Sequence, residues 1–136
     1  MRLDRFWFRI LCVLTVGVIA AASSAPALAQ SNMDPETVLV TYHVKADQEQ
    51  SLLKVLNQQW SALQRLDLVQ KGQPHLLLRG TEEGKPVVFE VFTWITADTP
   101  DHAPAEIQAL WKQMQNSVES RGGHPGIDIR TVTEVE

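Results

Sequence analysis

Residues His75–Thr96, HLLLRGTEEGKPVVFEVFTWIT, carry the strongest structural signal in this chain. Two runs of β-forming residues flank the polar segment Thr81–Lys85, in which Gly84 occupies a position that often needs left-handed backbone. The second run is long and rich in Val, Phe, Thr and Trp, which suit a pleated, half-buried surface. The stretch therefore predicts a β-hairpin. A hairpin alone is barely stable in water, so other elements must cover one of its faces.

A strand and a helix are predicted before the hairpin. Residues Thr37–Lys45, TVLVTYHVK, alternate between an apolar set that should pack on helices and a mixed set. Asp47 followed by Gln50 is typical of a capping-box start, and the spacing is helical from there to about Leu66. A loop centred on residues 71–74 follows. The apolar strand set is Val38, Val40, Tyr42 and Val44, and the helix stripe is Leu52, Leu53, Leu56, Trp60 and Leu63.

A second helix and a last strand are predicted after the hairpin. The connector TADTPDHAP at 96–104 is rich in turn residues, and Pro104 suits the first turn of a helix because its missing N–H costs nothing there. Gly122 and Gly123 are expected to end this helix. Residues Ile127–Val135 alternate as the closing strand. The helix stripe holds Ile107, Leu110, Trp111, Met114 and Val118.

The order β-α-β-β-α-β predicts an α+β, ferredoxin-like fold, with a four-stranded antiparallel sheet and two helices on one face. The alternation assigns an apolar set to the helix-free face of the sheet. A face this apolar usually marks an interface, so we expect two sheets to meet in a homodimeric α/β barrel. The set is Leu39, His43, Leu77, Val88, Phe92, Trp94 and Val132.

The first 29 residues read as a secretory signal peptide. A basic start precedes the apolar run Ile10–Ala22, and Ala27-Leu28-Ala29 supplies a small-x-small cleavage site. The run is shorter than the roughly 20 residues of a membrane span, although an uncleaved anchor is the alternative. We therefore expect an exported protein, periplasmic or secreted after cleavage near Ala29. A polar lead-in at 30–36 and one domain at 37–136 follow.

Composition excludes several classes of function. Cys12 lies within the leader, so the mature chain has no disulfide, thiol nucleophile or thiolate metal site. Cleavage removes three arginines and one aspartate, which changes the formal net charge from −4 to −6. No basic run remains, so neither nucleic acid nor a membrane is an expected partner. The sequence also lacks a Gly-rich phosphate loop, a nucleophile elbow and an HExxH motif. No cofactor and no metal are expected.

Five features together resemble a known family. They are the first strand TVLVTYHVKAD running into its helix, the strand FEVFTWIT, the connector with His102, the helix EIQALWKQM and the closing GIDIRTVTEV. Over Thr37–Val135 the chain resembles the antibiotic biosynthesis monooxygenase-type (ABM-like) domains of the dimeric α/β-barrel superfamily. The resemblance implies a homodimer with a pocket in each subunit, between the sheet and the helices or within the barrel.

The activities that the resemblance implies are varied. They include cofactor-independent oxygenation of phenol-like or anthrone-like aromatics and haem breakdown, and some members have no established activity. Haem-degrading members rely on an Asn on an early strand and on a Trp and a His on the second helix. Here the first strand has no Asn, and the helix after Pro104 has Trp111 but no His. Haem degradation is therefore disfavoured.

His102 is the candidate catalytic residue, because the connector borders the pocket in similar domains and a histidine can accept a proton from a phenol. The alternative is an ordinary surface histidine. The predicted ligand pocket comprises His43, Arg79, Glu90, Phe92, Trp94 and Trp111.

Each pocket residue has a plainer interpretation. Trp94 and Trp111 suit an aromatic wall for a flat ligand, or simple core packing. Arg79 and Glu90 lie on opposite arms of the hairpin and are expected to pair across it. His43, His75 and Glu90 have the donor types of a metal site, but their spacing does not support one. The mixed sheet face is expected to hold His43, His75, Arg79, Glu90, Asp128 and Arg130.

Two functions remain open from the sequence. The first is an exported ABM-like barrel that binds a small, largely apolar or aromatic ligand and oxidises it without a cofactor, with His102 assisting deprotonation. The second is a non-catalytic dimeric barrel with a structural or interaction role. An enclosed cavity that reaches His102 would favour the first, and a filled interior the second.

Overall fold

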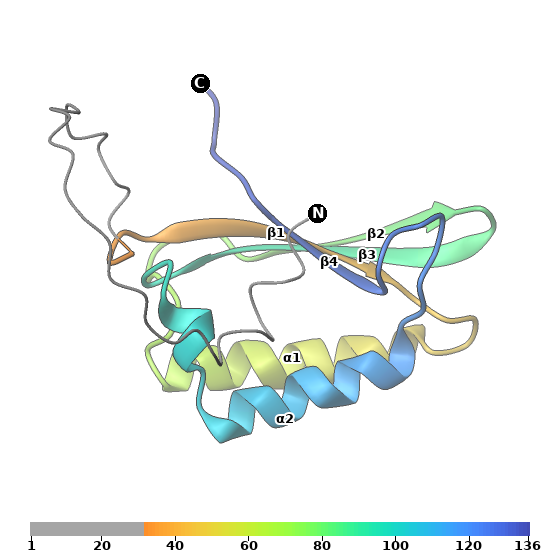
Figure 1. Ribbon diagram of the computed structural model, residues 1–136, viewed down its shortest axis with the longest axis horizontal. Coiled ribbons are helices and arrows are strands. Elements are labelled where there is room, and N and C mark those ends of the chain that lie inside the picture. Colours follow the sequence, from red (N-terminus) through yellow and green to blue (C-terminus); the bar gives the residue numbers. More distant parts are fainter. Residues whose placement is uncertain (1–31) are drawn as a thin grey trace, which may run out of the picture.

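The computed structural model describes residues 32–136, so the predicted signal peptide at 1–29 lies outside the described residues. A four-stranded antiparallel sheet lies over two α-helices, both on the same face (Figure 1). The predicted α+β, ferredoxin-like fold is confirmed. The elements are β1 (Glu36–His43), α1 (Glu49–Arg65), β2 (Leu76–Glu82), β3 (Lys85–Trp94), η2 (Thr99–His102), α2 (Ala105–Met114), η3 (Gln115–Ser117) and β4 (Ile127–Thr131), where η marks a short 3₁₀ helix.

β2 and β3 form the predicted hairpin. Glu83 and Gly84 join them with φ angles of 51° and 77°. Two successive residues with positive φ are typical of a type I′ turn, whose twist matches that of the flanking strands. This turn fixes the register of the hairpin, which places Leu78 opposite Phe89.

α1 begins later than the sequence pattern indicates. Asp47 has a φ of 65° and lies in a turn before the helix, and the N-cap residue is Gln48, which makes no side-chain capping bond. The capping-box prediction was therefore wrong. The apolar stripe is confirmed, because Leu52, Leu56 and Leu63 are all buried in the core.

α2 is shorter than predicted. Pro104 is its N-cap residue rather than a member of the first turn, and the helix ends at Met114, well before Gly122. The reason lies in Val118, whose backbone is extended and forms an antiparallel bridge with Val44 after β1. The chain leaves the helix early because it pairs with this extension of the sheet.

The strand order is β2-β3-β1-β4, so β2 lies at one edge of the sheet and β4 lies at the other. β4 ends at Thr131 rather than at Val135, although the N–H of Val132 still donates to the carbonyl of Thr37 at 3.0 Å. The C-terminal segment then leaves the sheet on the side away from the helices (Figure 1). None of the helices in residues 32–136 has the length and apolarity needed to cross a membrane.

The register overturns part of the predicted assignment of sheet faces. Phe92 lies opposite Val38, and Glu90 lies opposite Val40. Residues directly opposite each other share a face, so the alternate residues of β3 point toward the helices together with the apolar set of β1. The residues wrongly assigned to the helix-free face on this count are Leu77, His75, Arg79, Val88, Glu90, Phe92 and Trp94.

The presence of Glu90 in β3 explains why these residues were assigned to the wrong face of the sheet. A strand set that contains a carboxylate looks mixed, and a mixed set is normally assigned to the less buried face. Here the carboxylate is completely buried, with 0% of Glu90 exposed. Hydrogen bonds from Tyr42 and His75 make this burial tolerable.

The helix-free face is nevertheless apolar, and Leu39 lies on it as predicted, although its apolar neighbours differ from those predicted. Leu39 pairs with Val91, and Phe89 pairs with Leu78, so all four side chains lie on this face. On the edge strand Leu76 and Leu78 are 47% and 53% exposed. We call Leu39, Leu76, Leu78, Phe89 and Val91 the open-face cluster.

Candidate functional site

Glu90 is the centre of a buried polar network between the sheet and the helices. The hydroxyl of Tyr42 donates to Glu90 Oε2 at 2.7 Å, and His75 Nε2 lies 2.9 Å from Oε1. Because a carboxylate only accepts, His75 Nε2 carries the proton of that bond. A buried charge is tolerated only when it is hydrogen-bonded, and each carboxylate oxygen here has a donor.

Tyr42 is held in its neutral form by this arrangement. It is buried within the core, and burial is the main cause that raises its pKa well above the ordinary tyrosine value of 10.0. The negative charge of Glu90 and the hydrogen bond to Glu90 raise the pKa further, while a hydrogen bond with Gln59 acts in the opposite direction. Tyr42 therefore serves the carboxylate as a stable donor.

His75 connects the network to the protein surface. Its ring stacks on the Trp60 indole, with centroids 3.8 Å apart and planes inclined by 15°. Trp60 comes from α1, whereas His75 directly precedes β2 at the sheet edge. The side chain of His75 is 18% exposed, so the imidazole spans from solvent to the buried carboxylate.

Aromatic side chains enclose the rest of this region. Phe92 meets Trp94 edge-on at 4.9 Å, and Trp94 meets Trp111 of α2 edge-on at 6.4 Å. Phe92 also meets Trp60 edge-on at 6.2 Å. The indole N–H of Trp111 donates to Gln59 Oε1 at 2.8 Å, so this wall is tied to the side chain that contacts Tyr42. Such edge contacts are favourable aromatic geometry.

A hollow of about 180 Å³ adjoins Trp60 at the surface. Its volume is below the roughly 300–1,000 Å³ of sites for drug-sized ligands, so it suits a single-ring compound. Polar side chains and backbone of the loop before β2 form much of its wall. The lining residues are Trp60, Gln64, Val69, Gln70, Lys71, Gly72 and Gln73.

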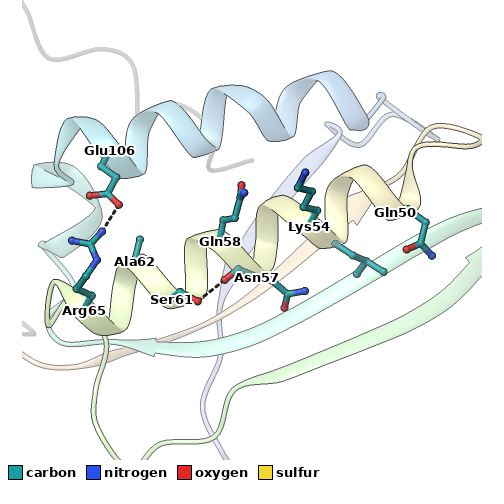
Figure 2. A pocket seen from close by; sticks show the side chains of 9 residues that line it. Gln50, Lys54, Asn57, Gln58, Ser61, Ala62, Arg65 and Glu106 are labelled. Atoms are coloured by element: carbon teal, nitrogen blue, oxygen red, sulfur yellow. Dashed lines mark hydrogen bonds and ion pairs between the residues drawn. The ribbon is translucent and has the colours of Figure 1, made fainter.

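A larger, open groove of about 800 Å³ runs along α1 toward α2 (Figure 2). Arg65 of α1 and Glu106 of α2 form an ion pair at one end of it. The other labelled side chains are Gln50, Lys54, Asn57, Gln58, Ser61 and Ala62, and the Ser61 hydroxyl donates to the backbone carbonyl of Asn57 at 3.0 Å. This groove is open along the helix surface and no aromatic side chain lines it, so it is a poorer match for an aromatic ligand than the region of Glu90.

The structure brings together four of the seven predicted site residues, namely Glu90, Phe92, Trp94 and Trp111. His102 lies in η2 with its side chain 75% exposed, and its Nε2 is 2.9 Å from Asp98. Arg79 pairs with Glu49 of α1 rather than with Glu90, so the predicted cross-hairpin pair was wrong.

His43 lies apart from the network as well. Its Nδ1 is 2.8 Å from the carbonyl of Pro125, and its Nε2 is 3.5 Å from Glu82, at the hairpin end of the sheet. His43 therefore does not join His75 and Glu90. Within residues 32–136, no three metal-ligating side chains gather in one group.

The sequence pattern indicates other roles for the residues around Glu90. It puts Tyr42 and Trp60 in apolar packing stripes, and nothing in it marks Gln59. One signal was present, because a lone Glu between Val88 and Phe92 in an apolar strand needs a donor if that strand is buried. Which residues supply the donors depends on the pairing of β1 with β3, and the sequence does not contain that register.

The comparisons with known proteins concern the fold. No protein-family model and no curated protein sequence matches this chain. A protein of Caulobacter crescentus called a candidate antibiotic biosynthesis monooxygenase matches in structure with a TM-score of 0.53 and 20% identity, over 76% of this chain and 93% of its own.

Two further solved structures agree. The Rv0793 protein of Mycobacterium tuberculosis matches with a TM-score of 0.54 and 12% identity, over 76% of this chain and 97% of its own. The protein SO0527 of Shewanella oneidensis matches with a TM-score of 0.52 and 20% identity, over 74% of this chain and 91% of its own. This chain therefore shares its fold with these three proteins, one of which is called a candidate antibiotic biosynthesis monooxygenase, and this agrees with the fold predicted from the sequence resemblance.

Proposed function

We propose that this chain is an exported, homodimeric ABM-like barrel that binds a small aromatic ligand next to Glu90 and oxidises it without a cofactor. The observation that carries the proposal is a completely buried carboxylate, bonded to Tyr42 and His75, beside an aromatic wall. Replacing buried ion pairs by apolar residues is often neutral or stabilising. A buried Glu that stability alone does not require is thus a candidate for function.

Glu90 supplies the base that such a ligand needs. A phenol must lose its proton to become electron-rich enough to react with oxygen, and a carboxylate can accept that proton. The carboxylate is approached from the surface past His75, which is part exposed. We assign the proton acceptor to Glu90 in place of His102, because the His102 imidazole is exposed and already paired with Asp98, and neither the hollow at Trp60 nor the groove along α1 is lined by His102.

The homodimer is proposed from the open-face cluster. Exposed apolar side chains that adjoin on one flat sheet face usually mark an interface. A second copy would cover this face with an identical one, and two such sheets would close a barrel. The leader at 1–29 is the basis for proposing export.

The direct test is mass spectrometry of small molecules retained by the purified mature protein, followed by titration with a panel of single-ring phenols. A retained or titrated aromatic compound supports the proposal, and oxygen uptake with that compound supports the oxidation. Glu90→Gln should weaken binding and abolish oxygen uptake, whereas the surface variant Glu106→Gln should leave both unchanged. If the native protein retains and binds no aromatic compound, the non-catalytic barrel is the better account.

A further inference from the structure

The His75 imidazole occupies the position of a flat ligand. It stacks on the Trp60 indole at 3.8 Å, and its Nε2 reaches the buried carboxylate of Glu90 at 2.9 Å. A planar ring held by one aromatic face and one directed hydrogen bond is how proteins commonly bind small aromatic compounds. Here a side chain of the protein itself fills that arrangement.

The backbone allows this side chain to move away. His75 directly precedes Leu76, the first β2 residue paired with β3, and β2 is an edge strand. The loop before it, residues 71–74, is exposed throughout, and Gly72 has a φ of 82°. Rotation of His75 would therefore leave the β2–β3 ladder intact.

The space beside His75 suits an incoming ring. The hollow of about 180 Å³ shares Trp60 with the stack and is bordered by Lys71 and Gly72 of the same loop. A single-ring compound can collect there before it reaches the indole face. Tyr42 keeps its hydrogen bond to Glu90 Oε2, so one carboxylate oxygen stays satisfied while the other exchanges its donor.

We propose that His75 is a displaceable plug, and that the ligand is a flat, uncharged single ring with a phenolic O–H or ring N–H. This ligand stacks on Trp60 and donates to Glu90 Oε1 in place of His75 Nε2. The inference rests on the proposed function and adds to it the class of ligand. An anionic ring such as benzoate is excluded, because the acceptor is itself a carboxylate. A saturated ring loses the stacking contact.

The first test follows His75 in the native mature protein by NMR, with phenol as the probe. In the free protein its ring protons should show the upfield shift that a stacked indole produces. Saturating phenol should remove that shift and leave the ring signals of His43 and His124 unchanged. If phenol binds while the His75 signals stay in place, the plug is wrong although the proposed function stands.

The second test compares phenol binding by native protein, His75→Ala and the matched control His124→Ala, whose side chain is exposed at the hairpin end of the sheet. A hydrogen bond to a charged group contributes about 1.5–3 kcal/mol, which corresponds to a closed form favoured roughly 10- to 150-fold. Removing the plug should therefore tighten phenol binding about tenfold or more. The native protein binds phenol only in the small fraction of molecules in which His75 has moved away, whereas every His75→Ala molecule is open.

Benzoate and cyclohexanol should bind none of these variants measurably. If His75→Ala is too unstable alone, imidazole should raise its melting temperature while leaving that of His124→Ala unchanged. Equal phenol affinity of His75→Ala and native protein, or no response of His75→Ala to imidazole, would overturn the inference. Absence of phenol binding to both proteins would instead count against the proposed function as well.

Discussion

Tyr42→Phe gives the sharpest test of the buried network. The substitution removes only the hydroxyl that donates to Glu90 Oε2 at 2.7 Å, and the ring packing is retained. Removing one donor from a buried charged acceptor lowers the free energy of unfolding by about 2–3 kcal/mol. In a domain of about 100 residues each kcal/mol shifts the melting temperature by roughly 4 °C, so we expect a decrease of about 8–12 °C.

The matched control is Thr131→Val. Its hydroxyl also donates to a carboxylate, that of Glu36 at 2.8 Å, but this pair is exposed. Loss of an exposed bond usually changes stability by less than about 0.5 kcal/mol. Chemical denaturation of both variants measures the difference. If Tyr42→Phe costs no more than Thr131→Val, the carboxylate of Glu90 is not the buried acceptor described above.

Tyr42 also makes the network visible to alkaline titration, because it is the only tyrosine in the chain. Burial, and then the charge of Glu90, keep its pKa well above 10.0 in the folded state. The unfolded state therefore loses this proton first, and stability falls as the pH rises above about 10. Tyrosinate absorbance should appear only as circular dichroism shows unfolding. Tyrosinate that forms near pH 10 in protein with native circular dichroism would refute the reasoning.

Three shorter predictions concern other parts of the molecule. Leu78→Glu places a charge in the open-face cluster and should convert the dimer into a monomer in analytical ultracentrifugation. The control variant Gln58→Glu, on the helix side, should remain a dimer. If the native protein is itself a monomer, the proposed barrel is contradicted. Gly126→Ala should destabilise by about 1–3 kcal/mol in a denaturation experiment, because its Cβ would lie 2.8 Å from Val118 Cγ2. Hydrogen bonds from Lys85 and then Arg121 lower the pKa of Glu119, so native stability should decline as the pH falls below about 4.5, and Glu119→Gln should show a smaller decline in acid titration.

The amino-acid sequence alone predicted the elements and their order. Strand alternation, helical spacing and the Glu83-Gly84 turn act between near neighbours in the chain, so their effects are readable locally. The boundaries were less accurate where distant pairing intervened, as at Val118, which leaves the helical path to bridge with Val44. The candidate aromatic residues of the site were found because large apolar side chains in strands and helices must pack somewhere.

Only the three-dimensional fold decided which face of β3 points toward the helices. Alternation says that Glu90 and Phe92 share a face but not which face it is, and polarity pointed the wrong way because a carboxylate is seldom buried. Only the pairing of Val40 with Glu90 places that carboxylate among the helices, beside Tyr42 and His75. The periodicity of a strand is local, whereas the donors that make a buried charge tolerable come from residues 15 and 48 positions away in the chain.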